Sequence, residues 1–292
     1  MSLMFKNIVS YQPTGVAIGL SLLLLSLPLF VSAQRVTDNS FRWKTLAEGM
    51  EYGEWEAPEK SILNDSKISI LRLDPQLYKF ELLCASEHQR KNRTASEWAG
   101  EFGMMAVFNA GMYSLQNGRT SKGYMKNHAH YNNSHLNPAY NVMIAMQPQK
   151  AEDAAMALFD LTLTRWDSIR PHYASYSQLL RMIDRDGNSM SWDKRPWQAC
   201  SMAVCAIDTA GFIYFIFARS PYTHQQMIRF MLAMPFALRT TAYLEGGPEA
   251  SFYINTGDTT IAKYGSYVSR TYENDDNDHF WKIPNVIGIK KR

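Results

Sequence analysis

Between residues 67 and 247 the chain is a succession of short apolar runs of strand length, and this pattern constrains its fold more than any other feature. Runs such as NVMIAM, FIYFIFARS and LRTTAYLEGG are rich in β-branched and aromatic residues and are bounded by turn residues. Apolar residues recur at helical spacing in HQQMIRFMLAM, where Thr223 is a natural N-cap, and a shorter helix is indicated in TASEWAGEFG after Thr94 or Ser96. We therefore predict an α+β fold, a single domain with a mixed, largely antiparallel sheet core and a few helices.

Two pairs of neighbouring runs carry turn signals that predict hairpins. KISILRLDP and YKFELLCAS are separated by the turn-prone pair Asp74-Pro75, so we expect them to pair with each other as an antiparallel hairpin. A D-x-x-G turn, Asp208 to Gly211, joins the two strands in VCAIDTAGFIYFIF in the same way. The segment from residue 114 to residue 140 is long for a loop, which is typical of functional or mobile connections.

The chain begins with a feature of exported proteins. Lys6 precedes the apolar run VAIGLSLLLLSLPLFVSA, which ends in the small-residue triplet V-S-A. This arrangement predicts a secretory signal peptide cleaved before Gln34, with an uncleaved membrane anchor as the alternative. The predicted organisation is a signal peptide (1–33), an N-terminal segment that leads into the fold (34–60) and one main domain (61–292). We expect an exported protein, periplasmic or secreted, with no stable membrane partner after cleavage.

Charge and cysteine content argue against a nucleic-acid-binding protein and against a disulfide-rich scaffold. The formal net charge is +3, and no block of lysine or arginine stands outside the IGIKKR tail, so nucleic acid is not an expected partner. The cysteines are Cys84, Cys200 and Cys205, an odd number that does not form a disulfide scaffold. Cys200 and Cys205 are expected on opposite faces of one strand, and we interpret all the cysteines as small buried hydrophobic residues.

Common catalytic signatures are missing from the sequence. There is no P-loop, no dinucleotide-binding glycine fingerprint, no H-E-x-x-H and no G-x-S-x-G motif. His128, His130 and His135 lie close together, and an extended pair of histidines could chelate a transition metal. No acidic ligand lies nearby in the sequence, so we predict no metal site and no cofactor. The alternative is that the protein binds a divalent cation and functions as a metal-dependent phosphodiesterase.

Two acidic residues flank a glycine turn in YLEGGPEASFYI. Glu245 follows a predicted strand and precedes Gly246 and Gly247, which places a carboxylate at a strand end beside backbone that a ligand can approach. Glycoside hydrolysis uses carboxylates in such places, and Glu249 provides a second one. The alternative is a hairpin whose acids face solvent.

Two further segments predict ligand contacts. Arg219 ends a strand just before the helix capped by Thr223, and a guanidinium beside a helix N-terminus suits an anion such as a phosphodiester. The alternative is an arginine that satisfies loop carbonyls. Asn109 and Gly111 follow the strand MAVF, where the Asn side chain is predicted over a site and the glycine lets a ligand approach the backbone. A tight turn is the alternative there.

Four segments occur in the order found in a known family, namely FNAGMY, SYSQLLRMID, FIFARSPYT and YLEGGPEASFY. Over about residues 65 to 290 the chain resembles the phosphodiester glycosidase family, which includes many exported bacterial proteins. The most specific elements are an N-G/A-G-[MF]-[FY] turn, matched from Asn109 to Tyr113, and a D-G-G-x-x-S-like turn, matched over 245–251. The family usually has Asp at the position of Glu245 and Gly at that of Ala110.

The resemblance implies hydrolysis of the bond between a sugar anomeric carbon and a phosphodiester oxygen, with a glycan or sugar phosphate as the ligand. It implies Glu245 as the base or nucleophile, with Glu249 as the second choice. The phosphate clamp would be Arg219 with the helix start at Thr223. The other substrate-binding residues implied are Asn109, Gly111, Gln178, His224, Gly246, Gly247 and Ser251. The alternative from another class is a non-catalytic exported glycan-binding or envelope-assembly protein that keeps the fold.

Overall fold

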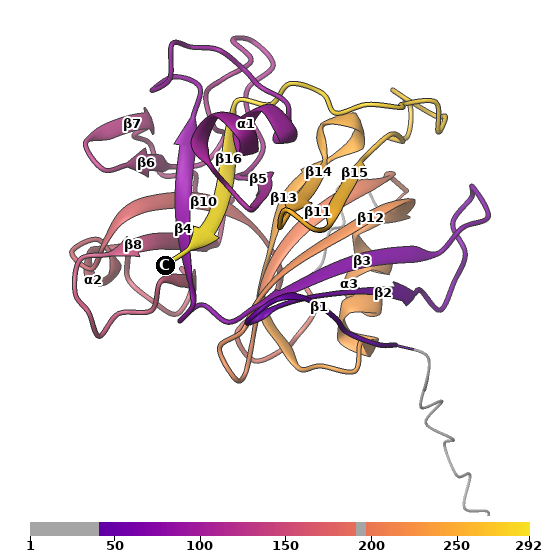
Figure 1. The fold of residues 1–292 in the computed structure, drawn as a ribbon, viewed down its shortest axis with the longest axis horizontal. Coiled ribbons are helices and arrows are strands. Elements are labelled where there is room, and N and C mark those ends of the chain that lie inside the picture. Colours follow the sequence, from indigo (N-terminus) through magenta and orange to yellow (C-terminus); the bar gives the residue numbers. More distant parts are fainter. Residues whose placement is uncertain (1–40, 191–196) are drawn as a thin grey trace, which may run out of the picture. The chain divides into compact units, whose positions relative to one another are not determined.

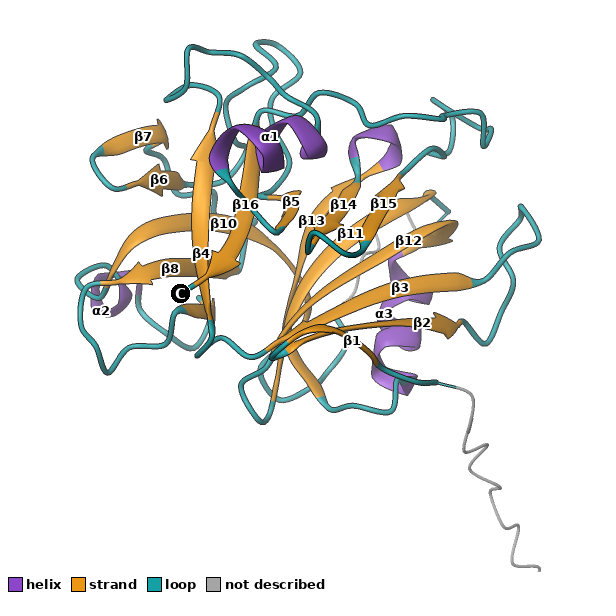
Figure 2. Cartoon of the chain, in the orientation of Figure 1, coloured by secondary structure: helices purple, strands orange, loops and turns teal. Residues whose placement is uncertain are grey.

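The computed structural model describes residues 41–190 and 197–292, which belong to one compact unit, Ser40–Arg292. The predicted signal peptide lies outside the described residues. Within the described part of the chain, no helix has both the length and the apolar character that crossing a membrane requires. Strands dominate the unit and helices are few, as Figure 2 shows.

A large sheet of eleven strands forms the first layer (Figure 1). Its order is β1-β2-β3-β12-β11-β13-β10-β6-β7, with β8 paired to β10 and β9 paired to β8. The strands are β1 (Lys44–Ala47), β2 (Met50–Glu56), β3 (Lys67–Leu73), β6 (Met125–Asn127), β7 (His130–Asn133), β8 (Val142–Pro148), β9 (Met156–Asp160), β10 (Tyr173–Ile183), β11 (Ala199–Asp208), β12 (Ile213–Thr223) and β13 (Leu238–Gly246).

A second sheet of five strands has the order β15-β14-β5-β16-β4. Its strands are β4 (Tyr78–Cys84), β5 (Ala106–Asn109), β14 (Ser251–Asn255), β15 (Thr260–Tyr264) and β16 (Asn285–Lys291). All pairs of named strands between residues 41 and 292, apart from the undescribed 191–196, are antiparallel. The largely antiparallel sheet is thus confirmed, and its mixed character is wrong. Continuous apolar runs are typical of parallel sheets, but here they arise because strands of the large sheet are buried on both faces.

The helices begin where local capping signals predict them. In α1 (Ala95–Phe102), Thr94 and Glu97 form a capping box, and Gly103 ends the helix in the left-handed region with φ 65°. In α3 (His224–Ala233), Thr223 and Gln226 form the corresponding box. The remaining elements are α2 (Trp166–Ile169) and a 3₁₀ turn, η1 (Gly247–Glu249). Both predicted helices and both predicted N-caps are confirmed, although the small helical share means that the α+β label fits only roughly.

Hydrophobic clusters stack the elements in layers. One cluster lies between the two sheets and includes Leu71, Phe108 and Phe215. A second covers the other face of the large sheet, where Met227 and other residues of α3 pack. A third joins α1 to the outer face of the small sheet. The order is therefore α1, small sheet, large sheet and α3, in agreement with Figure 1.

The predicted hairpin of β3 and β4 is wrong. β3 pairs with β2 and β12, whereas β4 pairs with β16 at the far end of the chain. The Asp74 turn therefore carries the chain from one sheet to the other. Local turn chemistry does not reveal this, because pairing depends on partners more than a hundred residues away. By contrast, β11 and β12 do form the hairpin predicted around Asp208 and Gly211.

Part of the N-terminal segment belongs to the large sheet. β1 and β2 lie within residues 34–60, and β2 pairs with β3 along its whole length. The cysteines are free and buried, as predicted. Cys205 lies in the cluster between the sheets and Cys200 in the cluster under α3, which confirms that they face opposite sides.

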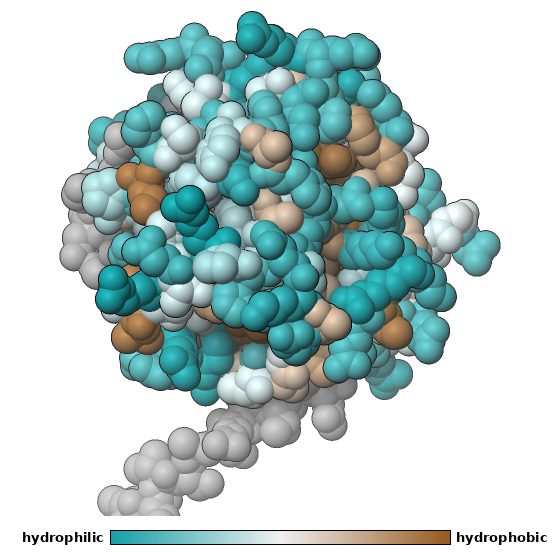
Figure 3. Space-filling model, turned by 90° about the vertical axis from the view of Figure 1, so that its left-hand side faces the viewer, coloured by the Kyte–Doolittle hydropathy of each residue, from teal (hydrophilic) through white to brown (hydrophobic). Residues whose placement is uncertain are grey.

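The surface on the side of β6, β7 and α2 is mostly hydrophilic and carries only small, separate hydrophobic areas (Figure 3). Among the described residues, Leu115 is the most exposed large apolar side chain, at 82% in the loop before β6. Scattered apolar residues of this kind are normal for a folded domain, so this face does not indicate a large apolar docking surface.

Candidate active site

The glycine turn and the Asn109 turn are held together by side-chain hydrogen bonds. The Asn109 amide Nδ2 donates to the carbonyl of Glu249 at 2.9 Å, and its Oδ1 accepts from the Ser251 amide at 2.7 Å. Ser251 Oγ donates to the same Glu249 carbonyl at 3.1 Å. Asn109 is buried and both ends of its amide are hydrogen-bonded to the turn that carries the carboxylates, so it fixes that turn. Two motifs that are 140 residues apart in the sequence meet at one place.

Close packing explains the glycines of this turn. A Cβ on Gly246 would lie 2.2 Å from Tyr243 Oη and 3.0 Å from Cys200 Sγ. Gly247 has φ +66°, a conformation that side chains rarely adopt. Its carbonyl oxygen would lie only 2.0 Å from a Cβ on Gly265. Gly246 thus makes room for the side chains of Tyr243 and Cys200, and Gly265 makes room for the backbone of the turn.

Gly265→Ala tests this packing. The added methyl group meets a backbone carbonyl that cannot rotate away, so we expect the unfolding free energy to fall by about 1–3 kcal/mol. Gly100→Ala is the control, because nothing beyond its chain neighbours and the backbone of α1 lies within 4 Å of its Cβ position. It should instead stabilise the protein by about 0.5–1 kcal/mol. Denaturant titrations of both variants measure the difference, and equal effects would contradict the close approach.

Burial makes the two carboxyl groups weaker acids than exposed glutamates. Burial, and secondarily the charge of Glu249, raises the pKa of Glu245 from 4.5 to about 8, while Lys122 acts in the opposite direction. Burial also raises the pKa of Glu249. At neutral pH Glu245 is therefore mostly protonated and ready to donate a proton.

Aromatic hydroxyl groups surround the carboxyl pair. Tyr113 belongs to the FNAGMY motif, and burial followed by the charges of Glu249 and Glu245 raises its pKa. Burial and then Glu245 raise the pKa of Tyr140 to about 12. Tyr243 is buried under Gly246, and its pKa is raised by burial and by neighbours that include both carboxylates. These phenols stay protonated at neutral pH and can donate hydrogen bonds.

The start of α3 contributes a neutral histidine. The rings of His224 and Tyr243 lie with centroids 4.9 Å apart, and burial lowers the pKa of His224 to about 4. His224 therefore carries no charge at neutral pH. Thr223 Oγ1 accepts from the Gln226 amide at 3.1 Å and donates to Gln226 Oε1 at 3.0 Å, so its hydroxyl serves the helix cap.

Gln178 and Gly111 have structural contacts. Gln178 Nε2 donates to the carbonyls of Asn137 and Tyr140, and its Oε1 accepts from the amides of Tyr124 and Asn137, at 2.8–3.0 Å. Gln178 therefore anchors the long loop instead of presenting its amide to a ligand. A Cβ on Gly111 would lie 2.5 Å from Leu179 Cδ2, and its φ is +129°.

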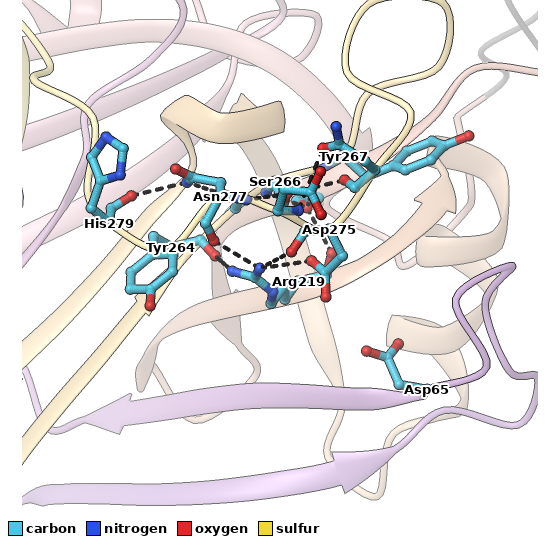
Figure 4. A network of polar contacts seen from close by, with 12 residues as sticks. Asp65, Arg219, Tyr264, Ser266, Tyr267, Asp275, Asn277 and His279 are labelled. Atoms are coloured by element: carbon cyan, nitrogen blue, oxygen red, sulfur yellow. Dashed lines mark hydrogen bonds and ion pairs between the residues drawn. The ribbon is translucent and has the colours of Figure 1, made fainter.

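Arg219 ties down a loop (Figure 4). Nη1 donates to the Tyr264 carbonyl at 2.9 Å, and Nη2 donates to the carbonyls of Asp275 and Asn277 at 3.0 and 2.9 Å. Nη2 also forms an ion pair with Asp275 Oδ1 at 2.7 Å. Arg219 is not among the charges that shift the pKa of Glu245. These contacts match the alternative interpretation, an arginine that satisfies loop carbonyls, and the structure does not join its guanidinium to the carboxyl pair.

The histidines of the long loop do not gather. His130 Nε2 is 2.8 Å from Ser86 Oγ, whereas His128 and His135 are exposed. In the described ranges, no group of three or more His, Cys, Asp or Glu residues is arranged to hold a metal ion.

Sequence reasoning missed several residues that surround the carboxyl pair, namely Tyr113, Lys122, Tyr140 and Tyr243. Tyr113 and Tyr243 lie inside motifs that were recognised, so their positions were an available signal. Lys122 and Tyr140 lie in the long loop, where no periodic pattern indicates which side chains turn toward the site.

The fold has known counterparts. It is similar to the catalytic domain of zebrafish N-acetylglucosamine-1-phosphodiester alpha-N-acetylglucosaminidase, auto-inhibited by its pro-peptide, with a TM-score of 0.59 and 10% sequence identity over 85% of this chain and 86% of that one. It is also similar to a hypothetical protein from Synechocystis, with a TM-score of 0.59 and 9% identity over 86% of this chain and 64% of that one, less than two thirds of its length. No family model and no curated protein matches the sequence. At these identities the likeness is one of fold alone, a distant relationship to a glycosidase catalytic domain.

Proposed function

We propose that the protein is a hydrolase of sugar-1-phosphodiester linkages, in which Glu245 is the general acid and Glu249 the base or nucleophile. The observation that carries the proposal is a pair of carboxyl groups on one rigid turn, one of them with a pKa near 8. The fold likeness to a glycosidase catalytic domain supports the reaction class. An exported protein that acts on glycans or glycoconjugates is consistent with the predicted signal peptide.

The assignment of roles differs from the sequence expectation, which favoured Glu245 as base or nucleophile. A base or a nucleophile must be ionised, and a carboxyl group with a pKa of about 8 is mostly protonated at neutral pH. Because the groups interact, the proton belongs to the pair, but the larger burial effect and the charge of Glu249 favour its residence on Glu245. Two carboxyl groups whose environments separate their acidities are typical of glycosidases.

The reaction balances with these groups. The Glu249 carboxylate takes a proton from an attacking water, or attacks the anomeric carbon itself, as the bond from that carbon to the phosphoryl oxygen breaks. Glu245 donates its proton to the departing oxygen. When Glu249 acts as the base, it holds the proton taken from water, and solvent returns that proton to Glu245. When Glu249 acts as the nucleophile, it is left in a glycosyl ester, which water hydrolyses while the Glu245 carboxylate takes the proton of that water. Both routes give a sugar with a free anomeric hydroxyl and a phosphomonoester. A phosphomonoester is a good leaving group, so the acid contributes less than it does in an ordinary glycosidase.

The supporting residues position this pair. Asn109 and Ser251 fix the turn, and the close approach of Gly247 to Gly265 holds it against the next segment. Tyr113 and Tyr140 are protonated donors near the carboxylates and suit the hydroxyl groups of a sugar.

A substrate screen tests the proposal. We expect the purified protein to release reducing sugar and a phosphomonoester from at least one sugar-1-phosphodiester, without added metal and in the presence of a chelator. Binding of glycans with no turnover of any phosphodiester would instead favour the non-catalytic alternative. Activity that a chelator abolishes and a divalent cation restores would favour a metal-dependent phosphodiesterase.

A further inference from the structure

A site that contains two carboxyl groups repels an anionic ligand when either carboxyl group is ionised. A phosphodiester carries one negative charge, and an ionised Glu249 repels it. A cation close to the pair would offset this repulsion, and Arg219 is engaged with the loop from Tyr264 to Asn277. This inference rests on the proposed function and concerns which residue receives the phosphate.

We propose that Lys122 binds the phosphodiester group of the substrate. Lys122 lies on the return of the long loop, where Tyr113 and Ser121 form an antiparallel bridge and the Lys122 amide donates to the Met112 carbonyl at 2.9 Å. The loop thus runs beside the FNAGMY turn. The pKa of Tyr113 in that turn is raised by burial and then by the charges of Glu249 and Glu245. Lys122 is the described cation that acts on Glu245.

The backbone at Lys122 is fixed although its side chain is exposed. Asn137 Nδ2 donates to the Lys122 carbonyl at 3.0 Å, and the Ser121 amide donates to Asn132 Oδ1 at 2.7 Å. Gly123 packs so closely on β10 that a Cβ would lie 2.1 Å from the Gln178 carbonyl oxygen. Among the described residues, no carboxylate lies within 4.0 Å of the Lys122 ammonium group. Lys122 thus combines a flexible cationic side chain with a fixed backbone beside the turn that Asn109 ties to Glu249, and it has no ion-pair partner of its own in the described chain, which suits an incoming anion.

The affinity of the site for a phosphodiester should therefore depend on pH. With Glu245 protonated and Glu249 in the ionised form that its proposed role requires, the charges of Lys122 and Glu249 cancel, and a monoanionic diester meets no net charge from these three residues. Deprotonation of Glu245 adds one negative charge, so phosphodiester binding should weaken as the pH rises through about 8.

Lys122→Met is the test, with Lys122→Arg as the conservative variant and Lys126→Met as the matched control on β6. Calorimetric titration with inorganic phosphate and with a sugar 1-phosphate should show about 10- to 100-fold weaker binding in Lys122→Met, which corresponds to the loss of one charged contact. Lys122→Arg should retain most of the affinity, and Lys126→Met should equal the wild type. Unchanged melting temperatures show that the variants are folded.

Kinetics separate this inference from the proposed function. In Lys122→Met, KM for a sugar-1-phosphodiester should rise by a similar factor, while turnover of an uncharged aryl glycoside should change little. The apparent pKa of Glu245 in the pH profile should also rise, because its cationic neighbour is gone. Phosphate binding equal to that of the wild type, or absent from the wild type, would overturn the role of Lys122. A wild type that binds phosphate through Lys122 but turns over no phosphodiester would refute only the proposed function.

Discussion

Glu249→Gln is expected to lower kcat for a sugar-1-phosphodiester by about 10²–10⁴-fold, because the amide can neither accept a proton nor attack the anomeric carbon. The change is isosteric, and the backbone carbonyl that Asn109 and Ser251 bind is retained. We therefore expect the melting temperature to change little and KM not to rise, since the variant also removes the repulsion between the Glu249 carboxylate and the phosphodiester. Steady-state kinetics near neutral pH, with circular dichroism melts, measure both effects.

Glu152→Gln provides the matched control. Glu152 is exposed in the turn between β8 and β9, so the same chemical change there should leave kcat unaltered. Turnover by Glu249→Gln at the wild-type rate would remove Glu249 from the chemistry. In that case the pair would have to be reinterpreted as structural acids of a hairpin.

Glu245→Gln is expected to alter the pH dependence of stability. The folded pKa of Glu245, about 8, lies above the unfolded value near 4.5, so between these pH values the folded state binds more protons than the unfolded state. The contribution of Glu245 to stability is therefore complete below about pH 4.5 and is lost as the pH rises to about 8. Partial exposure of the side chain reduces the total loss to the order of a few kcal/mol.

The uncharged glutamine resembles the protonated acid and has no such loss. Unfolding free energies from urea titrations at about pH 5, 7 and 9 should diverge, with the variant gaining on the wild type as the pH rises. The difference between the two curves isolates Glu245 from other titrating groups. Parallel curves would mean that the folded pKa of Glu245 is close to its unfolded value. Glu245 would then be ionised at neutral pH and could not act as the general acid.

Local signals in the sequence predicted local structure well. The N-caps at Thr94 and Thr223 are side-chain contacts within a single turn, so the residues that form them are neighbours in the chain. The hairpin around Asp208 and Gly211 is local in the same sense. Each of these elements needs no information from distant segments.

Strand pairing was predicted less well, because it is decided by distant partners. β4 pairs with β16, the last strand of the described chain, and nothing in YKFELLCAS specifies that C-terminal strand as its neighbour. The same limit applies to the absence of parallel pairs among the described strands. Burial on both faces makes β11 and β12 uniformly apolar, and the sequence alone does not distinguish this cause from a parallel sheet.

The candidate site was predicted in part. The turns at Asn109 and Glu245 were singled out separately, and the structure joins them through the hydrogen bonds of the Asn109 amide. Arg219 was singled out because it precedes a helix N-terminus, but sequence proximity does not fix where a long side chain points. Its guanidinium turns to the carbonyls of a segment about 50 residues further along. Lys122 was missed because an aperiodic loop gives no indication of which residues face the site.

The bond that is cleaved tests the central claim most directly. Hydrolysis of a reactive sugar-1-phosphodiester in water enriched in oxygen-18, followed by phosphorus NMR of the released phosphomonoester, identifies it. If Glu245 and Glu249 act at the anomeric carbon, the water oxygen enters the sugar and the phosphomonoester carries no label. Label in the phosphomonoester would show attack at phosphorus, and the protein would then be a phosphodiesterase whose carboxyl pair does not act as proposed.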